Sequence, residues 1–468
     1  MTKPIIAIVG RTNVGKSTLL NRLAGKRLSV VADLPGTTRD RIFASVSWQG
    51  RELTLIDTGG WQVKPQLLLE QKVIQQVEVA VAQADVAIFM VDARDGVIAA
   101  DEEIADMLRG TNKPIVLAVN KMDSAKQANP VADFYHLGIG EPIAISAYHN
   151  RGISELMDTV LAFLPPPPPP SSVESEEAKL TIVGRPNVGK STLLNALLDD
   201  ERAIVHETPG TTRDSLDAVV CWDDKKFLLI DTAGIKRRGR VDSGVDYYSL
   251  LRALQAINRC DVALLLIDAS EFITAQDMHI AGYIIEVGKG IILVVNKWDL
   301  VPRLQRQEFK RYMEQRPKFI SYAPAVYISA ELRQNVSGVL PQAWQVWQER
   351  QRHLPQTEVN MVVKEAVSSH PPPRIGSRRL RIGRAYQDES RPATFILQVN
   401  DPQLVHFSYQ RYLENKLRHK FGFRGVPLQL IFTRAAYKSN KKSRGGEFKN
   451  VVAQLTFAQG AKQWRNIR

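Results

Sequence analysis

The stretch Gly10–Leu23 reads GRTNVGKSTLLNRL and Gly184–Leu197 reads GRPNVGKSTLLNAL, so the chain carries nearly the same fourteen residues twice. Both fit the P-loop pattern G-x-x-x-x-G-K-[ST], in which glycines let backbone N–H groups wrap phosphate oxygens at a helix start. The lysine adds charge at the β- and γ-phosphates, and the serine hydroxyl binds Mg²⁺. The predicted phosphate-binding residues are Gly10, Asn13, Val14, Gly15, Lys16, Ser17 and Thr18, and then Gly184, Asn187, Val188, Gly189, Lys190, Ser191 and Thr192.

Further motifs follow each loop in the same order. PGTTRD at Pro35–Asp40 returns at Pro209–Asp214, and DTGG at Asp57–Gly60 returns as DTAG at Asp231–Gly234. NKMD at Asn120–Asp123 returns as NKWD at Asn296–Asp299. The period is far longer than that of a solenoid repeat, so the sequence predicts a duplicated domain.

Each copy alternates short apolar runs with helical patterns. The runs are rich in Val, Ile and Leu without polar alternation, which indicates strands buried on both faces of a mostly parallel sheet. The expected strands are IIAIVG, LTLID, VAIFMVDA, PIVLAVN and PIAIS in the first copy, and LTIVG, FLLID, VALLLIDA, GIILVVN and AVYIS in the second. The predicted fold is therefore α/β, with two tandem doubly wound P-loop domains.

Composition changes mark the expected boundaries. Six prolines at Pro165–Pro170, followed by an acidic Ser/Glu segment, indicate a polyproline II linker. After a closing helix at Val339–Glu349, the chain predicts a small α+β domain and then a basic tail from Tyr437. The expected divisions are 1–164 and 179–350 for the duplicated domains, 165–178 for the linker, 351–436 for the third domain and 437–468 for the tail.

The net charge of +13 is unevenly distributed along the chain. The stretch 350–468 holds 23 Lys or Arg against 7 Asp or Glu, and the rest of the chain is slightly acidic. A basic end favours an anionic partner such as nucleic acid, with a solvated basic face as the alternative. Two cysteines, Cys221 and Cys260, exclude a disulfide framework and are expected to be small buried hydrophobes. We find no signal peptide or membrane span and expect a cytoplasmic protein.

A P-loop binds only the phosphates of a nucleotide, so other residues must recognise the base. Asn-Lys-x-Asp after a buried strand is the guanine-recognition signature of Ras-like GTPases, because an aspartate accepts two N–H groups that guanine presents and adenine lacks. A later Ser-Ala pair resembles the loop whose backbone N–H reads the guanine oxygen. The predicted guanine-binding residues are Asn120, Lys121, Asp123, Ser146 and Ala147, and then Asn296, Lys297, Asp299, Ser329 and Ala330.

The same resemblance assigns the remaining motif residues. Asp57 and Asp231 resemble the aspartate that holds Mg²⁺ through water, and Gly60 and Gly234 resemble the glycine that senses the γ-phosphate. The switch threonines that close on Mg²⁺ are expected to be Thr38 and Thr212, with Thr37 and Thr211 as close alternatives.

Two P-loop GTPase domains followed by a basic domain containing VNDPQLVHFSYQRYLENKLRHKFGF resemble the Der (EngA) family of bacterial ribosome assembly GTPases. The resemblance runs from Lys3 to about Arg434. It implies a KH-like third domain, GTP or GDP with Mg²⁺ as ligands, and binding to the large ribosomal subunit and its rRNA. We expect no DNA, no membrane and a monomer.

Trp61 and Ile235 stand where Ras-type enzymes place the glutamine that orients the attacking water. Neither side chain can do this, so intrinsic hydrolysis should be slow. The family resemblance implies a bound K⁺ held partly by Asn13 and Asn187, although both residues could instead only shape the loop. The predicted catalytic residues are Lys16, Lys190, Asn13, Asn187, Gly60 and Gly234. The chain departs from the family pattern at Thr12, where the second copy has Pro186.

Several basic groups remain as candidates for nucleic-acid contact. Lys236–Arg240 could contact RNA or be a solvated loop. Gly422–Gly425 has the G-x-x-G form of a KH clamp, but a proline and a strand follow, so we interpret Gly422 as a helix C-cap. The histidines His370, His406 and His419 are too scattered for a metal site. Binding by the third domain would then rest on Arg378, Arg379, Arg381, Arg411 and Arg418.

The sequence thus favours a GTPase that binds an assembling large ribosomal subunit in a nucleotide-dependent way. A GTPase acting on RNA modification or membrane biogenesis would need a further module that is not visible. An RNA-binding scaffold with little turnover is the alternative from another class, and potassium-dependent turnover would separate it from an enzyme.

Overall fold

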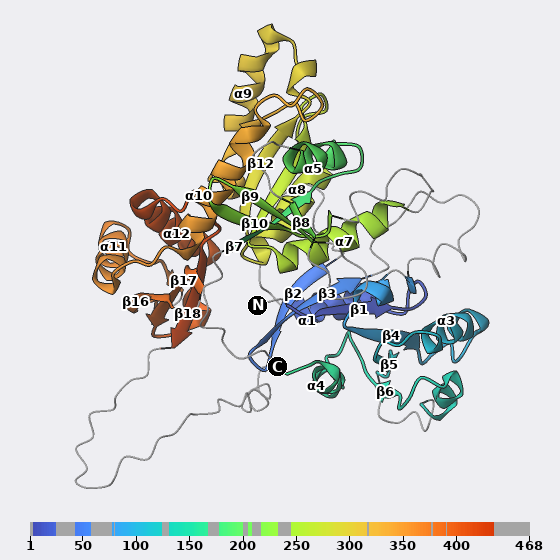
Figure 1. Cartoon of the computed structure of the whole chain (residues 1–468). Helices are drawn as coiled ribbons and strands as arrows, with labels where there is room; N and C mark the ends of the chain where they lie inside the picture. The colour runs from blue at the N-terminus through green and yellow to red at the C-terminus, as the bar shows by residue number, and fades with distance from the viewer. Residues whose placement is uncertain are drawn as a thin grey trace.

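The computed structural model describes residues 3–24, 43–57, 77–78, 80–123, 131–166, 177–199, 205–207, 217–232, 245–315, 318–375, 378–389 and 391–434. Three units follow one another in Figure 1, coloured blue, green to yellow, and orange to red. Within these residues no helix is long and apolar enough to cross a membrane.

The first unit is a mostly parallel six-stranded sheet in the order β2-β3-β1-β4-β5-β6. All seven residues of its central strand β4 are buried, as expected for a strand covered on both faces. The elements are β1 (Ile5–Val9), α1 (Lys16–Ala24), β2 (Phe43–Trp48), β3 (Arg51–Asp57), β4 (Val86–Asp92), α3 (Ala99–Arg109), β5 (Ile115–Asn120), η1 (Ala132–Leu137), β6 (Ile143–Ala144) and α4 (Ile153–Phe163).

The second unit repeats this plan with the sheet order β13-β12-β11-β7-β10-β9-β8. Its strands are β7 (Glu177–Val183), β8 (Val205–Glu207), β9 (Ala218–Trp222), β10 (Lys225–Leu229), β11 (Val262–Asp268), β12 (Gly290–Asn296) and β13 (Ala325–Tyr327). Its helices are α5 (Lys190–Leu198), α7 (Val245–Arg259), α8 (Ala275–Glu286), η2 (Trp298–Leu300), η3 (Arg303–Gln305), α9 (Arg306–Glu314), η4 (Lys318–Ile320), η5 (Val336–Gly338) and α10 (Val339–Gln351). Two doubly wound α/β domains are therefore confirmed.

Three antiparallel strands were not predicted from the sequence: β2, at an edge of the first sheet, and β9 and β8, the last two strands of the second. Strand β2 pairs with β3, and β9 with β10, through two-residue turns at Gln49-Gly50 and Asp223-Asp224. All four turn residues have positive φ, as a type I′ hairpin requires. Cys260 is buried as expected, but Cys221 is only half-buried because it lies on β9 near the sheet edge.

The third unit packs two helices against a three-stranded sheet, in the order β16-β17-β18, with β17 and β18 parallel. The stretch 378–387 is divided between two strands, because β15 pairs with β14 and β16 pairs with β17. The elements are α11 (Gln356–Ser369), β14 (Arg374–Ile375), β15 (Arg378–Arg379), β16 (Ile382–Asp388), β17 (Arg391–Val399), η6 (Pro402–Leu404), α12 (Phe407–Phe421) and β18 (Gln429–Arg434).

The turn that ends α12 fastens the third unit to the second. Gly422 has φ +86° and its N–H donates to the Arg418 carbonyl at 2.8 Å, which confirms the C-cap. Gly425 then donates its N–H to the Tyr322 carbonyl at 2.9 Å and accepts from the Ile291 N–H at 2.8 Å. The G-x-x-G segment therefore binds the second unit, and one apolar core runs through both units.

The first two units also share a core. Buried residues of the helical segment 77–84 pack in one cluster with Leu254 and Ile257 of α7. The Gln255 side chain donates to the Gln83 carbonyl at 2.6 Å, and the Ser45 N–H donates to Glu286 at 3.0 Å. The segment that follows the first DTGG motif thus contacts the helix that follows the second copy's DTAG motif.

A buried lysine lies beside this junction. Burial lowers the pKa of Lys289 to about 8, and its ammonium donates to the Cys260 carbonyl at 2.7 Å. Asp261, Arg350 and Lys3 are the charged groups nearby. Between pH 8 and about 10.4 the unfolded chain holds this proton and the folded chain does not. The free energy of unfolding should therefore rise with pH across that window, by up to about 3 kcal/mol from this group.

Urea unfolding at pH 7.5, 9 and 10.5 tests this. Lys289→Met should flatten the rise with pH, and Lys113→Met, at an exposed lysine, should leave it as in the parent chain. The slope is diagnostic rather than the absolute stability, because methionine also leaves the Cys260 carbonyl without its donor. Equal slopes in the parent chain and Lys289→Met would refute the assignment.

Candidate nucleotide-binding sites

Each predicted phosphate loop joins a central strand to a helix. Asn13 and Asn187 adopt left-handed φ of 66° and 64° at the exposed loop tips. A Cβ on Gly15 would lie 2.3 Å from the Asn120 amide nitrogen, and one on Gly189 would lie 2.3 Å from that of Asn296. Only glycine fits there, so the backbone forms the narrow cradle that a phosphate group requires.

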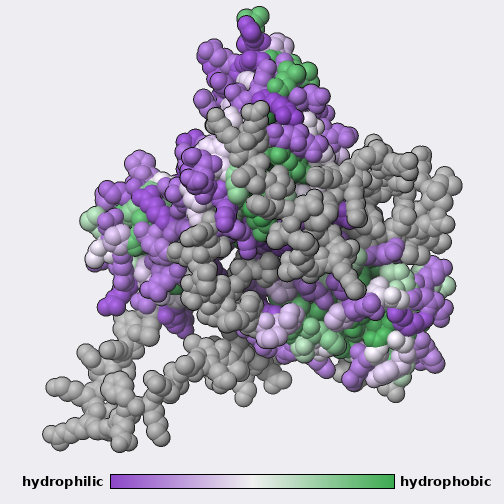
Figure 2. Space-filling view, in the orientation of Figure 1, coloured by the Kyte–Doolittle hydropathy of each residue, from purple (hydrophilic) through white to green (hydrophobic). Residues whose placement is uncertain are grey.

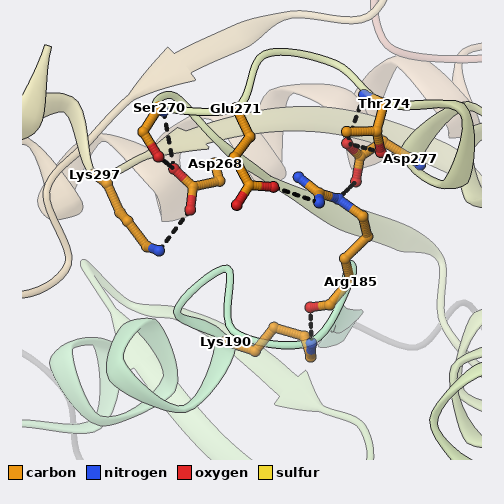
Figure 3. Close-up of polar contacts among 8 residues, drawn as sticks. All are labelled: Arg185, Lys190, Asp268, Ser270, Glu271, Thr274, Asp277 and Lys297. Carbon is orange, nitrogen blue, oxygen red and sulfur yellow. Dashed lines mark hydrogen bonds and ion pairs between the residues drawn. The ribbon is translucent and has the colours of Figure 1, made fainter. Parts of the chain in front are cut away.

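The two loop lysines lie across their own loops. Lys16 Nζ donates to the carbonyls of Gly10 at 2.8 Å and Arg11 at 2.6 Å. Lys190 Nζ makes the same contacts with Gly184 and Arg185, and Figure 3 shows it directed at the Arg185 carbonyl. Burial lowers the pKa of Lys16. Both ammonium groups are thus held at the mouth of the cradle.

Oxygen donors suited to Mg²⁺ meet beside the first loop. Ser17 Oγ donates to Asp57 Oδ2 at 2.5 Å, and Asp57 is fully buried at the end of β3. A hydroxyl and a carboxylate are the hard ligands that this ion prefers, so these residues fit it. In the second copy β10 ends two residues before Asp231, whose N–H donates to Asp217 Oδ1 at 3.0 Å.

The asparagine of each NKxD motif links two loops. Asn120 donates to the Val14 carbonyl at 2.7 Å and accepts from the Ala147 N–H at 2.9 Å. Asn296 makes the same two bonds with Val188 and Ala330, both at 2.9 Å. The structure therefore brings the predicted phosphate loop, NKxD motif and Ser-Ala loop together in both copies. The Ala147 and Ala330 N–H groups, predicted to read guanine, are here bound to asparagine.

The NKxD lysines are paired with acids that the sequence analysis missed. Lys121 forms an ion pair with Asp92, and Lys297 forms one with Asp268 at 2.5 Å. Both acids end a buried central strand and are almost fully buried themselves. Figure 3 shows Lys297 reaching Asp268, which also accepts from Ser270. The available signal was that both acids occupy the same position of an expected strand, Asp92 in VAIFMVDA and Asp268 in VALLLIDA.

A second missed group fixes the loop arginines. Arg185 Nη1 lies 2.7 Å from Glu271, and its Nε lies 3.0 Å from the fully buried Asp277. Asp277 also accepts from the Thr274 N–H and hydroxyl in a capping box at the start of α8 (Figure 3). The arginine thus ties the phosphate loop to the start of the helix that follows β11.

The first copy has the same arginine with a weaker anchor. Arg11 lies 2.5 Å from Asp95 and 3.4 Å from the buried Asp101. Ile98 stands at the N-cap and gives no side-chain bond, and burial raises the pKa of Asp101. The two loops are therefore alike in backbone geometry and different in how their arginines are held.

Several predicted residues lie outside the described part of the chain. They are Gly60, Gly234, Thr37, Thr38, Thr211, Thr212, Trp61, Ile235, Lys236–Arg240 and the tail 437–468.

The predicted basic face of the third unit needs one correction. Arg378, Arg379 and Arg381 are exposed, and Arg411 lies over the Phe407 ring. Arg418 is not part of that face. It donates to the Phe423 and Val426 carbonyls, pairs with Glu414 and stacks at 3.8 Å on Tyr322 of the second unit. A guanidinium with these partners is structural, which a helical charge pattern alone does not show.

The similarity of this chain to known protein families agrees with this geometry. The family described as "50S ribosome-binding GTPase" matches residues 5–121 and 179–297, and the family described as "KH-domain-like of EngA bacterial GTPase enzymes, C-terminal" matches 353–433. GTPase Der of Chloroflexus aggregans is 46% identical, with 92% of this chain and 98% of that protein covered. The chain belongs to the Der family. GTPase Der of Symbiobacterium thermophilum is 46% identical over 100% of this chain and 98% of its own.

As a Der-family member the chain is a GTPase, and GTP or GDP and Mg²⁺ are the ligands that the family implies. Among solved structures, a crystal structure of Era in complex with MgGDPNP and nucleotides 1506–1542 of 16S ribosomal RNA is 21% identical, with a TM-score of 0.29. That match covers 55% of this chain and 93% of the Era chain. A likeness at this level adds nothing to the assignment.

The two NKxD aspartates of this Der-family GTPase have different neighbours. Asp123 accepts from Ser146 Oγ at 2.8 Å and lies 2.5 Å from Arg94, and the pKa of Asp123 is lowered by the serine bond first and then by the arginine. Both carboxylate oxygens are engaged. The second copy has Ser270 in place of Arg94, and Ser270 bonds to Asp268 instead.

Arg94→Ser should therefore raise the affinity of the first site for GDP about two- to fivefold, because an exposed ion pair of about 0.5–1 kcal/mol no longer competes for the carboxylate. Titration of a fluorescent GDP measures this in a background where the second site is disabled by Asp299→Asn. Ser270→Arg should weaken the second site in return, measured with the first site disabled by Asp123→Ala. An unchanged or lower affinity of Arg94→Ser would show that the arginine does not compete.

Proposed function

We propose that the chain is a GTPase with two active sites that binds the assembling large ribosomal subunit, as a monomer, in a GTP-dependent way. The observation that supports two sites is the duplicated asparagine linkage. In both copies one side chain joins the phosphate loop to the Ser-Ala loop with bonds of 2.7–2.9 Å. The linkage holds the nucleotide-binding loops together, so its presence in both copies supports nucleotide binding by both.

The phosphate end of each site does the chemistry. The loop N–H groups hold the phosphates, and Lys16 or Lys190 leaves the loop carbonyls to reach the β- and γ-phosphates. Mg²⁺ supplies charge neutralisation at these phosphates when bound. Ser17 with Asp57, and Ser191 with Asp231, hold it together with Thr38 and Thr212, and Gly60 and Gly234 sense the γ-phosphate.

The guanine end sets specificity. Asp123 and Asp299 accept the two N–H groups of guanine, and Asn120 and Asn296 keep the base-binding and phosphate-binding loops in register. Adenine would leave a carboxylate unpaired, which costs far more than a lost contact.

Hydrolysis is proposed to need K⁺. Asn13 and Asn187 are exposed residues of the two loops, and Trp61 and Ile235 cannot orient a water. Phosphate release should be several-fold faster in KCl than in NaCl at equal ionic strength, and Asn187→Ala should remove that difference in the second site. Equal rates in both salts would reject the potassium site. Nucleotide binding without turnover in either salt would favour a scaffold.

Binding to the large subunit is proposed to use the exposed Arg378, Arg379 and Arg381. Co-sedimentation of the purified chain with ribosomal subunits, with GDP or a non-hydrolysable GTP analogue at two salt concentrations, tests this. We expect GTP-dependent, salt-sensitive pelleting with the large subunit, which charge reversal at the three arginines abolishes. No pelleting in any state would remove the ribosome from the proposal and leave the GTPase standing.

A further inference from the structure

The stretch between the guanine motif and the Ser-Ala loop is longer in the second copy than in the first. Asp123 and Ser146 are 23 positions apart, whereas Asp299 and Ser329 are 30 apart. This longer stretch contains η3 and α9, and α9 stands at the top of Figure 1. In Figure 2 this end of the molecule shows hydrophobic residues, in green, among hydrophilic ones.

Aromatic rings connect α9 to the guanine motif. Trp298, within NKWD, lies 5.4 Å from the buried Phe309 of α9. Phe309 stacks on Phe272 at 5.1 Å, and Phe272 meets the edge of Tyr312 at 5.1 Å. Phe272 is 47% exposed and Tyr312 is 40% exposed, so this row of rings begins at the nucleotide site and ends in solvent.

Phe272 holds a backbone conformation that its side chain disfavours. Its φ is +58°, and the equivalent position of the first copy is Gly96 with φ +66°. A bulky residue in the left-handed region is strained by about 1–3 kcal/mol, and such strain collects at functional positions. Packing on Phe309 alone does not account for a ring that leaves nearly half of its surface exposed.

Exposed positive charge lies on the same helix as Tyr312 and just before it, and the Lys310 ammonium lies over the Tyr327 ring at 5.6 Å. Arg303, Lys310 and Arg311 are exposed, and no described residue forms an ion pair with them. Arg306 lies over the Trp298 ring at 5.5 Å. The acids of α9 are Glu308 and Glu314, against Arg306, Lys310 and Arg311. Exposed aromatic faces bordered by cations are the combination that binds single-stranded nucleic acid, through base stacking and phosphate contacts.

We propose that Phe272, Tyr312, Arg303, Lys310 and Arg311 form a single-stranded RNA binding surface, here called the α9 platform. It rests on the proposed function, because an assembling subunit offers unpaired rRNA. Leu300 and Leu304 are also exposed and would suit a protein partner. Arg303, Lys310 and Arg311 form no ion pair with a described residue. These three cations favour a polyanion as the partner, since a protein partner would have to supply an acid for each of them.

The test uses the full chain with Arg378, Arg379 and Arg381 reversed to glutamate, so that RNA binding by the third unit does not hide the platform. A fluorescent twelve-nucleotide oligouridylate serves as the probe, measured by anisotropy with a GTP analogue present. Phe272→Gly, the residue of the first copy, removes the ring and the strain together, so it should fold at least as well as the parent. It should weaken RNA binding at least about fivefold.

Arg303→Glu/Lys310→Glu/Arg311→Glu should abolish the remaining affinity. Tyr135→Ala is the matched control, because Tyr135 is an exposed aromatic on η1 in the equivalent stretch of the first copy. Tyr135→Ala should leave the affinity for the oligouridylate unchanged. Ultraviolet crosslinks to the RNA should fall on Phe272 or Tyr312.

Unchanged affinity in Phe272→Gly, or no RNA binding in the background chain, would overturn the platform. Loss of subunit pelleting by platform variants of the chain that keeps Arg378, Arg379 and Arg381, at constant RNA affinity, would also overturn it and assign the surface to a protein. Failure of the proposed function is distinguishable, because it appears as absent pelleting of the parent chain with any subunit.

Discussion

Asp299→Asn should lower the affinity of the second site for GTP by about 10²–10⁴-fold, because the amide offers a donor to the guanine N–H groups that the carboxylate accepts. Xanthine nucleotides, which carry an oxygen in place of the guanine amino group, should bind the variant better than GTP does. Calorimetric titration with GDP and with xanthosine diphosphate measures both effects, with the first site disabled by Asp123→Ala.

Asp299 is the better of the two aspartates for this experiment. Among the described residues none donates a hydrogen bond to its carboxylate, whereas Asp123 accepts from Ser146 and Arg94. The substitution therefore removes no contact within the protein, and the melting temperature of the nucleotide-free chain should not change. Unaltered GTP affinity in a folded Asp299→Asn variant would refute the guanine assignment.

Gly425→Val should destabilise the attachment of the third unit to the second by about 3–5 kcal/mol. Gly425 has φ +76°, and a Cβ there would lie 2.5 Å from Val346 Cγ2 and 3.1 Å from Pro324 Cδ. Strain in the left-handed region and overpacking add to one another at this site. The bonds to Tyr322 and Ile291 would be lost as the chain moves away. Urea unfolding should show a lower midpoint for the third unit.

Gly422→Ala is the matched control for this prediction. Gly422 has φ +86°, but a Cβ there meets nothing within 4 Å, so only backbone strain of about 1 kcal/mol is expected. Protease cleavage between α10 and α11 should rise in Gly425→Val and stay low in the control. Equal stability of the two variants would mean that the close approach to Val346 does not hold the units together.

Much of the fold could be predicted because its strands and helices follow from short local patterns of apolar residues. Strands such as β4 and β11 are continuous apolar runs, and a strand buried on both faces leaves that pattern wherever it occurs. Strand β2, at a sheet edge, and the short strand β9 were not predicted, because their sequences FASVSW and AVVCW lack the long continuous Val/Ile/Leu run of the central strands. Their hairpin turns, Gln49-Gly50 and Asp223-Asp224, were the available signal.

In the candidate sites, too, the features that depend on one short stretch of chain could be predicted, and the contacts between distant residues could not. A phosphate loop is a single stretch of backbone, so its residues could be named from spacing alone. The pairing of Arg185 with Asp277 joins residues 92 positions apart, and nothing local to either one indicates the other. Arg418 was placed on an RNA-binding face for the same reason, since helical charge does not reveal Tyr322 beneath it.

The sequence by itself determined the two P-loop domains, their order and the guanine motifs, because each depends on residues close together in the chain. The tertiary structure alone decided that the G-x-x-G turn binds the second unit, that the two phosphate loops are anchored differently, and that Phe272 is exposed beside α9. Those outcomes depend on which distant surfaces meet. Contacts between surfaces that are distant in the chain form only on folding and leave no local pattern in the sequence.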